Sequence, residues 1–85
     1  MIKEDLWAHE GVRGIRITLE AEEELKSHST PGKVFIVCCD GKGEVSLHGQ
    51  RVPLKRGDVL EIGPGVPHGV KAEDRLTLYL TVFAR

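Results

Sequence analysis

The chain has 85 residues, of which 40% are hydrophobic and 29% charged, and its formal net charge at pH 7 is −1. This length allows one small domain with a modest core, so we expect a single domain over residues 1–85. The balanced charge gives no indication of a surface for nucleic acid. No apolar run is long enough to cross a membrane, and the charged first residues do not resemble a secretory leader. We therefore expect a cytoplasmic protein that contacts neither membranes nor nucleic acids.

The two cysteines, Cys38 and Cys39, are adjacent in the sequence. Neighbours on a strand point to opposite faces, so we expect no disulfide between them, and their spacing does not fit a zinc site. The sequence contains no Asn and a single Gln. Depletion of these thermolabile amides is a trend in proteins of hyperthermophiles, which suggests a thermophilic origin.

The first strong pattern is the alternation in residues 14–21, GIRITLEA, where Ile15, Ile17 and Leu19 share one face. A two-residue period of this kind predicts a half-buried strand. Residues 19–28, LEAEEELKSH, are the only helix candidate. Their apolar residues form no clean stripe, so the pattern favours a segment that is not helical.

Two further strands are expected in the middle of the chain. Residues 33–40, KVFIVCCD, form a continuous apolar run that is typical of a strand buried on both faces. After a glycine-rich turn, the segment EVSLHG alternates, with Val45 and Leu47 directed inward. Pro53 in the following RVPL segment favours an edge strand, because proline cannot donate a ladder hydrogen bond.

The last part of the chain predicts two more strands, with residues 68–72, HGVKA, as a further extended segment between them. Residues 58–62, DVLEI, place Val59 in the core and make Leu60 and Ile62 further core candidates. Residues 75–84, RLTLYLTVFA, alternate over a long strand. The residues on its apolar face are Leu76, Leu78, Leu80 and Val82. The sum is seven or eight short strands with turn signals about every 8–12 residues, which predicts an all-β sandwich or barrel.

A stiff bend precedes one of the histidines. In the sequence GPGVPHG, from Gly63 to Gly69, two prolines with fixed φ and two permissive glycines lead directly to His68. The backbone therefore sets the position of the His68 ring, as a metal ligand or a catalytic base requires. His28 ends an extended segment, and Thr30, two residues later, shares its face.

These two segments resemble the signature motifs of the cupin superfamily. The sequence RGDVLEIGPGVPHGV resembles the second motif, which Gly57, Asp58, Pro64, Gly65, Pro67 and His68 match. The sequence HSTPGKVFIVCCDGKG resembles the first motif, which His28, Gly41 and Gly43 match. The resemblance is to small single-domain cupins with H-x-T-P in place of H-x-H. It implies an antiparallel all-β barrel of the jelly-roll type, also described as a double-stranded β-helix.

The resemblance also implies a ligand pocket, in which His28, Thr30, Val34 and His68 meet. Thr30 stands where the family has a second histidine, and the carboxylate position falls on Val34, or on Phe35 with a slip of one residue. Two histidines and a hydroxyl are few ligands for zinc or non-haem iron. We therefore expect either no metal or one weakly held divalent ion (Zn, Fe, Mn or Ni) on His28 and His68. His9 and His48 are expected at the surface.

Three functions are open from the sequence. The first is a cupin that binds a small polar or anionic molecule between His28 and His68. The second is a metal-dependent oxygenase or isomerase that uses the same histidines as ligands. The third is a structural or regulatory module without chemistry. No nucleophile pattern is present, so no catalytic residue is assigned.

A partner chain is also expected. If Val34 faces the cavity, the side chains of Phe35, Val37 and Cys39 point outward on the same strand. One small barrel has a single interior, so this outer face needs cover from the N-terminal segment or from a second chain. Because cupins are commonly dimeric, we expect a homodimer.

Overall fold

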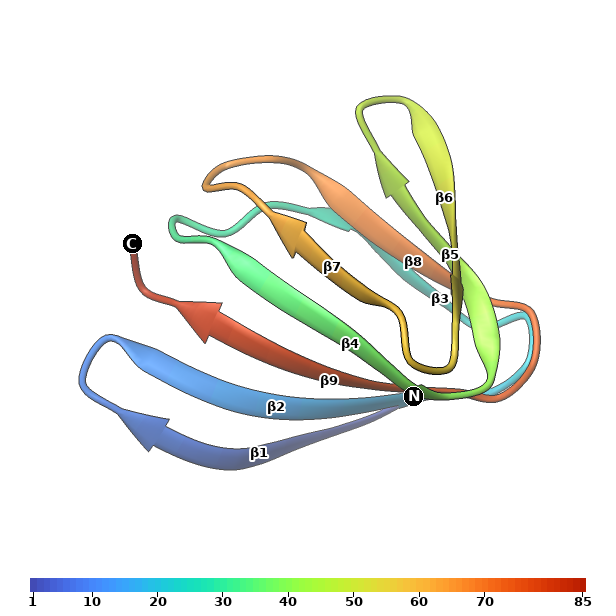
Figure 1. The fold of residues 1–85 in the computed structure, drawn as a ribbon, viewed down its shortest axis with the longest axis horizontal. Helices are drawn as coiled ribbons and strands as arrows, with labels where there is room; N and C mark the ends of the chain where they lie inside the picture. Colours follow the sequence, from blue (N-terminus) through green and yellow to red (C-terminus); the bar gives the residue numbers. More distant parts are fainter.

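The computed structural model of the protein describes residues 1–85 and contains nine β-strands and no helix (Figure 1). The strands are β1 (Ile2–His9), β2 (Val12–Leu19), β3 (Glu24–His28), β4 (Val34–Asp40), β5 (Lys42–Leu47), β6 (Gln50–Lys55), β7 (Val59–Ile62), β8 (His68–Ala72) and β9 (Leu76–Phe83). The fold offers no helix that is long and apolar enough to span a membrane.

The strands form two antiparallel sheets. One has five strands in the order β1-β2-β9-β4-β7, and the other has four in the order β3-β8-β5-β6. In Figure 1 the long strands β1, β2 and β9 lie at the lower left, and the β5–β6 hairpin projects at the upper right. The predicted all-β barrel of jelly-roll type is confirmed, and Pro53 lies on β6, an edge strand as predicted.

The core lies between the two sheets and follows the predicted alternation. Ile15, Ile17 and Leu19 of β2 are buried, and they pair with residues of β9 that are also buried. The core residues are Ile15, Ile17, Leu19, Val34, Ile36, Cys38, Val45, Leu54, Ile62, Val70, Ala72, Leu76, Leu78 and Leu80. Burial of these side chains supplies most of the free energy that favours folding.

The prediction that Val59 lies in the core is wrong. Val59 is 65% exposed, whereas Ile62 is buried and Leu60 packs against the core. Pairing with β4 decides the register, because Leu60 lies opposite Ile36 and Ile62 opposite Val34, both buried. A shift of one residue moves a whole strand face from core to solvent.

The expected strand of residues 33–40 is present as β4, but it is not buried on both faces. Phe35 and Val37 are half-buried and Cys39 is exposed, while the opposite face is buried. Lys33 covers part of the outer face, with its ammonium group 5.5 Å from the Phe35 ring centre and 5.4 Å from that of Phe83. Cys38 and Cys39 are both free thiols, as predicted.

β1 is a strand that the sequence pattern did not predict. A register shift between Asp5 and Trp7 interrupts its alternation. Beyond the shift, Trp7 lies over Gly14 of β2, where an added Cβ would meet the indole nitrogen at 2.2 Å. The same nitrogen donates a hydrogen bond of 2.9 Å to the Tyr79 hydroxyl. The Trp7 side chain therefore lies across the outer face of the five-stranded sheet and connects β1 to β2 and β9.

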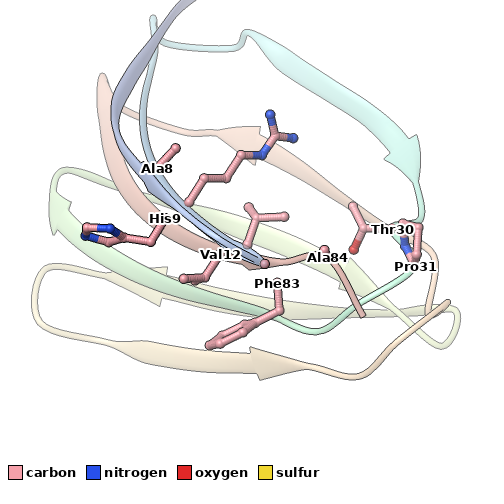
Figure 2. A pocket seen from close by; sticks show the side chains of 10 residues that line it. Ala8, His9, Val12, Thr30, Pro31, Phe83 and Ala84 are labelled. Carbon is pink, nitrogen blue, oxygen red and sulfur yellow. The ribbon is translucent and has the colours of Figure 1, made fainter.

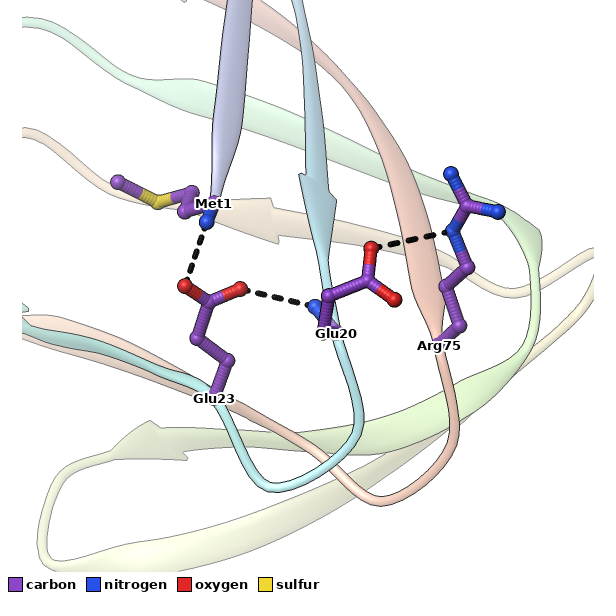
Figure 3. Close-up of polar contacts among 4 residues, drawn as sticks. All are labelled: Met1, Glu20, Glu23 and Arg75. Carbon is purple, nitrogen blue, oxygen red and sulfur yellow. Dashed lines mark hydrogen bonds and ion pairs between the residues drawn. The ribbon is translucent and has the colours of Figure 1, made fainter.

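The start of β1 is also tied to the turn that follows β2 (Figure 3). The N-terminal ammonium group of Met1 pairs with the Glu23 carboxylate, and this contact holds the pKa of Glu23 below its usual value. The second Glu23 oxygen accepts a hydrogen bond of 2.9 Å from the backbone N–H of Glu20. The Glu20 carboxylate lies 3.3 Å from Nε of Arg75. The Met1–Glu23 contact therefore ties the start of β1 to the turn between β2 and β3.

Candidate functional site

The two histidines of the predicted site lie opposite each other on neighbouring strands. His28 ends β3 and pairs with His68, the first residue of β8. Their ring centres are 4.5 Å apart, and the ring planes make an angle of 54°. His68 is 3% exposed, whereas His28 is exposed. One ring therefore lies inside the barrel and the other lies at its opening.

The bend before His68 is fixed by backbone hydrogen bonds. Gly65 has a φ of 73°, a conformation that glycine adopts without steric cost. Its N–H donates a hydrogen bond of 2.8 Å to the carbonyl of Thr30, and Val66 donates one of 3.3 Å to Gly63. The first bond joins the segments that carry His68 and His28, and the second closes the bend itself. The stiff bend predicted from the sequence thus places one ring against the other.

Each histidine uses the same ring nitrogen to contact the backbone. Nδ1 of His68 lies 2.9 Å from the carbonyl oxygen of Val66, and Nδ1 of His28 lies 3.2 Å from that of Lys26. A carbonyl oxygen only accepts, so both contacts assign the proton of the neutral ring to Nδ1. Nε2 of each ring is left free of protein partners, and in the neutral ring it is an acceptor.

A cavity of about 100 Å³ lies beside these rings. Twelve residues line it: Met1, Lys3, Arg13, Ile15, Ile17, Leu25, His28, Thr30, Val34, His68, Leu80 and Val82. The structure therefore brings all four predicted pocket residues, His28, Thr30, Val34 and His68, to one cavity. The hydroxyl of Thr30 donates to the carbonyl of Gly32 at 2.8 Å, so its proton is not available to a ligand.

The electrostatics of the site favour a neutral His68. Burial lowers the pKa of His68 below its ordinary value of 6.5, and the nearby His28 lowers it further. The carbonyl of Val66 acts in the opposite direction but is outweighed. At neutral pH the buried ring is therefore uncharged, with its acceptor Nε2 available.

The residues present do not complete a metal site. Two Nε2 atoms are available, but the carboxylate position is filled by the buried, apolar Val34. Nowhere in the chain do three or more His, Cys, Asp or Glu side chains gather closely enough to hold an ion. Catalytic zinc usually has three protein ligands, and non-haem iron has two histidines and a carboxylate. His28 and His68 alone supply two of the three.

Sequence reasoning missed two cationic residues at this cavity. Lys3 comes from β1, a strand that the pattern did not reveal, and Arg13 begins the inner face of β2. A signal for Arg13 exists, because it precedes Ile15 and Ile17 by steps of two and so shares their face. His9 and His48 are exposed, as predicted.

A wider groove of about 450 Å³ adjoins the cavity (Figure 2). Arg13, Thr30 and Val82 line both spaces. The other residues of the groove are Ala8, His9, Gly11, Val12, Pro31, Phe83 and Ala84. The groove therefore lies where the β1–β2 turn, the segment before β4 and the end of β9 meet, next to the opening of the cavity.

Comparison with known proteins decides the family. Residues 15–83 match the family described as Cupin domain. This chain is a cupin. A solved cupin from Desulfovibrio desulfuricans, described as RmlC-like, is 30% identical to it, with a TM-score of 0.90 over 98% of this chain and 81% of that one. The predicted membership of the cupin superfamily is confirmed.

Other solved cupins share the fold at lower identity. A cupin superfamily protein from Desulfitobacterium hafniense is 14% identical, with a TM-score of 0.94 over 99% of this cupin and 77% of that chain. Salicylate 1,2-dioxygenase from Pseudaminobacter salicylatoxidans is 24% identical, with a TM-score of 0.84 over 87% of this cupin and 21% of that chain. These likenesses show the fold alone. No curated protein matches the chain.

Proposed function

We propose that this cupin binds a small molecule in the cavity beside His28 and His68. The observation that carries the proposal is the pair of free Nε2 atoms, one of them on a buried ring, beside an apolar-walled cavity. Small-molecule sites typically combine apolar walls with a few placed polar groups. The backbone contacts at Nδ1 hold both rings in place without using Nε2.

The apolar wall of the cavity strengthens the hydrogen bonds that a ligand makes there. Ile15, Val34 and Leu80 exclude water from one side of the rings. Hydrogen bonds to Nε2 are stronger in this low-dielectric setting than in water. A bound hydroxyl or acid group donates to Nε2, and a protonated ring donates from the same atom to an anion.

The other two functions have less support. A metal-dependent oxygenase or isomerase usually needs a third histidine or a carboxylate as ligand, and the cavity adds only the Thr30 hydroxyl to His28 and His68. A purely structural module has no use for two Nε2 atoms without partners beside an open space. Cofactor binding of one divalent ion on His28 and His68 stays a prediction. Metal analysis of protein purified without added ions tests it.

Replacement of the histidines by asparagine tests the proposed site. The asparagine amide keeps a donor for the carbonyl of Val66 or Lys26 but lacks the Nε2 atom. We therefore expect His28→Asn and His68→Asn each to weaken binding of glycolate or glycolamide at least about fivefold, the scale of one lost hydrogen bond. Calorimetric or NMR titration measures this loss.

The matched control is His48→Asn, because His48 is exposed in a turn with a φ of 51° that asparagine tolerates. This variant retains the affinity of the parent. Equal binding by His68→Asn and the parent, with both folded, contradicts the proposed site.

We also propose that the protein is a homodimer formed through the outer face of the five-stranded sheet. Val59, Val37 and Tyr79 lie side by side on β7, β4 and β9, and Trp7 contacts Tyr79. Val59 is 65% exposed and Trp7 37% exposed. We call these apolar side chains the outer patch, and we infer that two copies of the chain bury it against each other across a twofold axis.

Val59→Lys tests the dimer. The side chain is already exposed, so the substitution leaves the core intact while it places a charge in the outer patch. We expect the mass from light scattering to fall from dimer to monomer. Ser46→Lys, which adds the same charge at an exposed residue of β5 in the four-stranded sheet, is the control and leaves the mass unchanged. A monomer mass for the parent protein overturns the proposal.

A further inference from the structure

We propose that Lys3 and Arg13 make the cavity selective for small carboxylate anions over neutral molecules of the same shape. This inference rests on the proposed function, because it concerns the ligand of the same cavity. It assigns a chemical class to that ligand and a role to two residues that sequence reasoning missed.

The β1–β2 hairpin delivers both cations to the cavity. Lys3 lies opposite Ile17, and Arg13 is two residues before Ile15 on β2. Since Ile15 and Ile17 face the interior, the period of two places Lys3 and Arg13 on the same face. Both residues line the cavity with His28 and His68.

The charge of the lining is one-sided. Among the twelve lining residues the titratable side chains are Lys3, Arg13, His28 and His68, and none is an aspartate or a glutamate. Arg16, Lys42, Arg51, Lys71 and Arg75 form ion pairs with glutamates elsewhere on the surface. Neither Lys3 nor Arg13 has a carboxylate within ion-pair distance. Two uncompensated cations at the opening attract an anion and repel a divalent metal ion.

One acidic residue opposes this field. Asp5 lies opposite Ile15, so it faces the same side of the hairpin as Lys3 and Arg13. It does not line the cavity and forms no ion pair with either cation. Its charge lowers the potential at the opening, so its removal strengthens anion binding. Replacement of Asp5 by Asn is therefore expected to change anion binding in the direction opposite to replacement of Lys3 or Arg13.

The volume limits the part of the ligand that enters. The cavity of about 100 Å³ equals the share of about three water molecules in the liquid. A carboxylate with one or two carbon atoms fills such a space. The adjoining groove, which shares Arg13 and Thr30 with the cavity, has room for the remainder of a longer molecule.

Matched pairs of small molecules test the selectivity. Acetate and acetamide have nearly the same shape and differ in charge, as do glycolate and glycolamide. Titrations followed by the backbone amide spectrum give a dissociation constant for each at low ionic strength. We expect each anion to bind about tenfold more tightly than its amide, the scale of two exposed charge interactions.

Substitutions assign the preference to the two cations. Lys3→Met and Arg13→Met each weaken anion binding about threefold and leave amide binding unchanged, and the double variant weakens it about tenfold. Asp5→Asn strengthens anion binding about twofold. Lys55→Met changes the net charge by the same amount as Lys3→Met, lies on β6 outside the cavity, and leaves all constants unchanged.

The outcomes separate this inference from the proposed function. Equal affinities for anions and amides, with shifts at His28 and His68, support the cavity as a ligand site and overturn the role of Lys3 and Arg13. Saturable anion binding that Lys3→Met and Arg13→Met do not change also overturns that role. No saturable shift with any of the four molecules contradicts the proposed function itself.

Discussion

At the scale of single residues, His68 is the most important side chain of the candidate site. The residue is 3% exposed, its Nδ1 donates to the Val66 carbonyl, and it lines the cavity. A buried imidazole without a charged partner prefers the neutral form. Burial and His28 together therefore lower the pKa of His68. This shift makes the stability of the folded state depend on pH.

The pH dependence of stability is a direct test of that environment. The folded pKa of His68 lies below the unfolded value of about 6.5, so below that pH the unfolded chain binds the extra proton first. The stabilisation is fully present above the unfolded pKa and falls as pH drops through the folded pKa. We expect the free energy of unfolding to fall as the pH drops below about 6.5, by at most about 1.4 kcal/mol per pH unit.

Urea unfolding of the parent and of His68→Asn measures this slope. The variant loses the part due to His68 and shows a flatter profile over the same range. The lowered pKa values of Glu4 and Glu23 act at lower pH, below their ordinary value of 4.5. Parallel profiles for parent and variant contradict the burial of a neutral ring.

At the scale of elements, the bend between β7 and β8 positions the site. Gly65 has a φ of 73°, and an added Cβ there meets no atom within 4 Å. The cost of Gly65→Ala is therefore backbone strain alone, about 1–2 kcal/mol. Gly63→Ala is the matched control, since its φ is not positive and its Cβ makes an ordinary contact of 3.6 Å with Val66.

We expect Gly65→Ala to lower the free energy of unfolding by about 1–2 kcal/mol and to shift the His68 ring resonances. Gly63→Ala changes stability by less than about 0.5 kcal/mol and leaves those resonances in place. Chemical denaturation and imidazole spectra of the two variants measure the contrast. Equal stability of the two variants means that the bend does not depend on the left-handed conformation of Gly65.

The elements also show what the sequence predicts and what it does not. The strands β2 and β9 were predictable because one residue in two is apolar and faces the core. β1 was not, because the shift between Asp5 and Trp7 breaks the alternation and its side chains are mostly exposed. Val59 was assigned to the wrong face, since only pairing with β4 fixes the register of so short a strand.

The residues of the candidate site also differ in how far the sequence predicts them. The cavity positions of His28, Thr30, Val34 and His68 were predictable because two motifs carry them. Arg13 was predictable, since it precedes Ile15 by two residues and so shares its face, whereas Lys3 was not, since β1 shows no clear alternation. The H-x-T-P subgroup, a cytoplasmic location and a thermophilic origin stay predictions.

At the scale of the whole molecule, the proposed ligand site and the proposed dimer interface lie on opposite faces of the five-stranded sheet. The interior between the sheets holds the core and, at one end, the cavity with its two imidazoles. The outer face of the five-stranded sheet carries the outer patch, which we assign to a second copy of the chain. Because β1 and β9 contribute to both surfaces, the proposed dimer face and the cavity share these two strands.

The most direct test of the central claim is a long-range ¹H–¹⁵N spectrum of the imidazole rings, recorded with and without glycolate. We predict that the neutral rings of His28 and His68 carry their proton on Nδ1. Glycolate should move the Nε2 signals of these two rings, while those of His9 and His48 stay in place. Protons on Nε2 of both rings, or Nε2 signals that no carboxylate or amide moves, would contradict the claim.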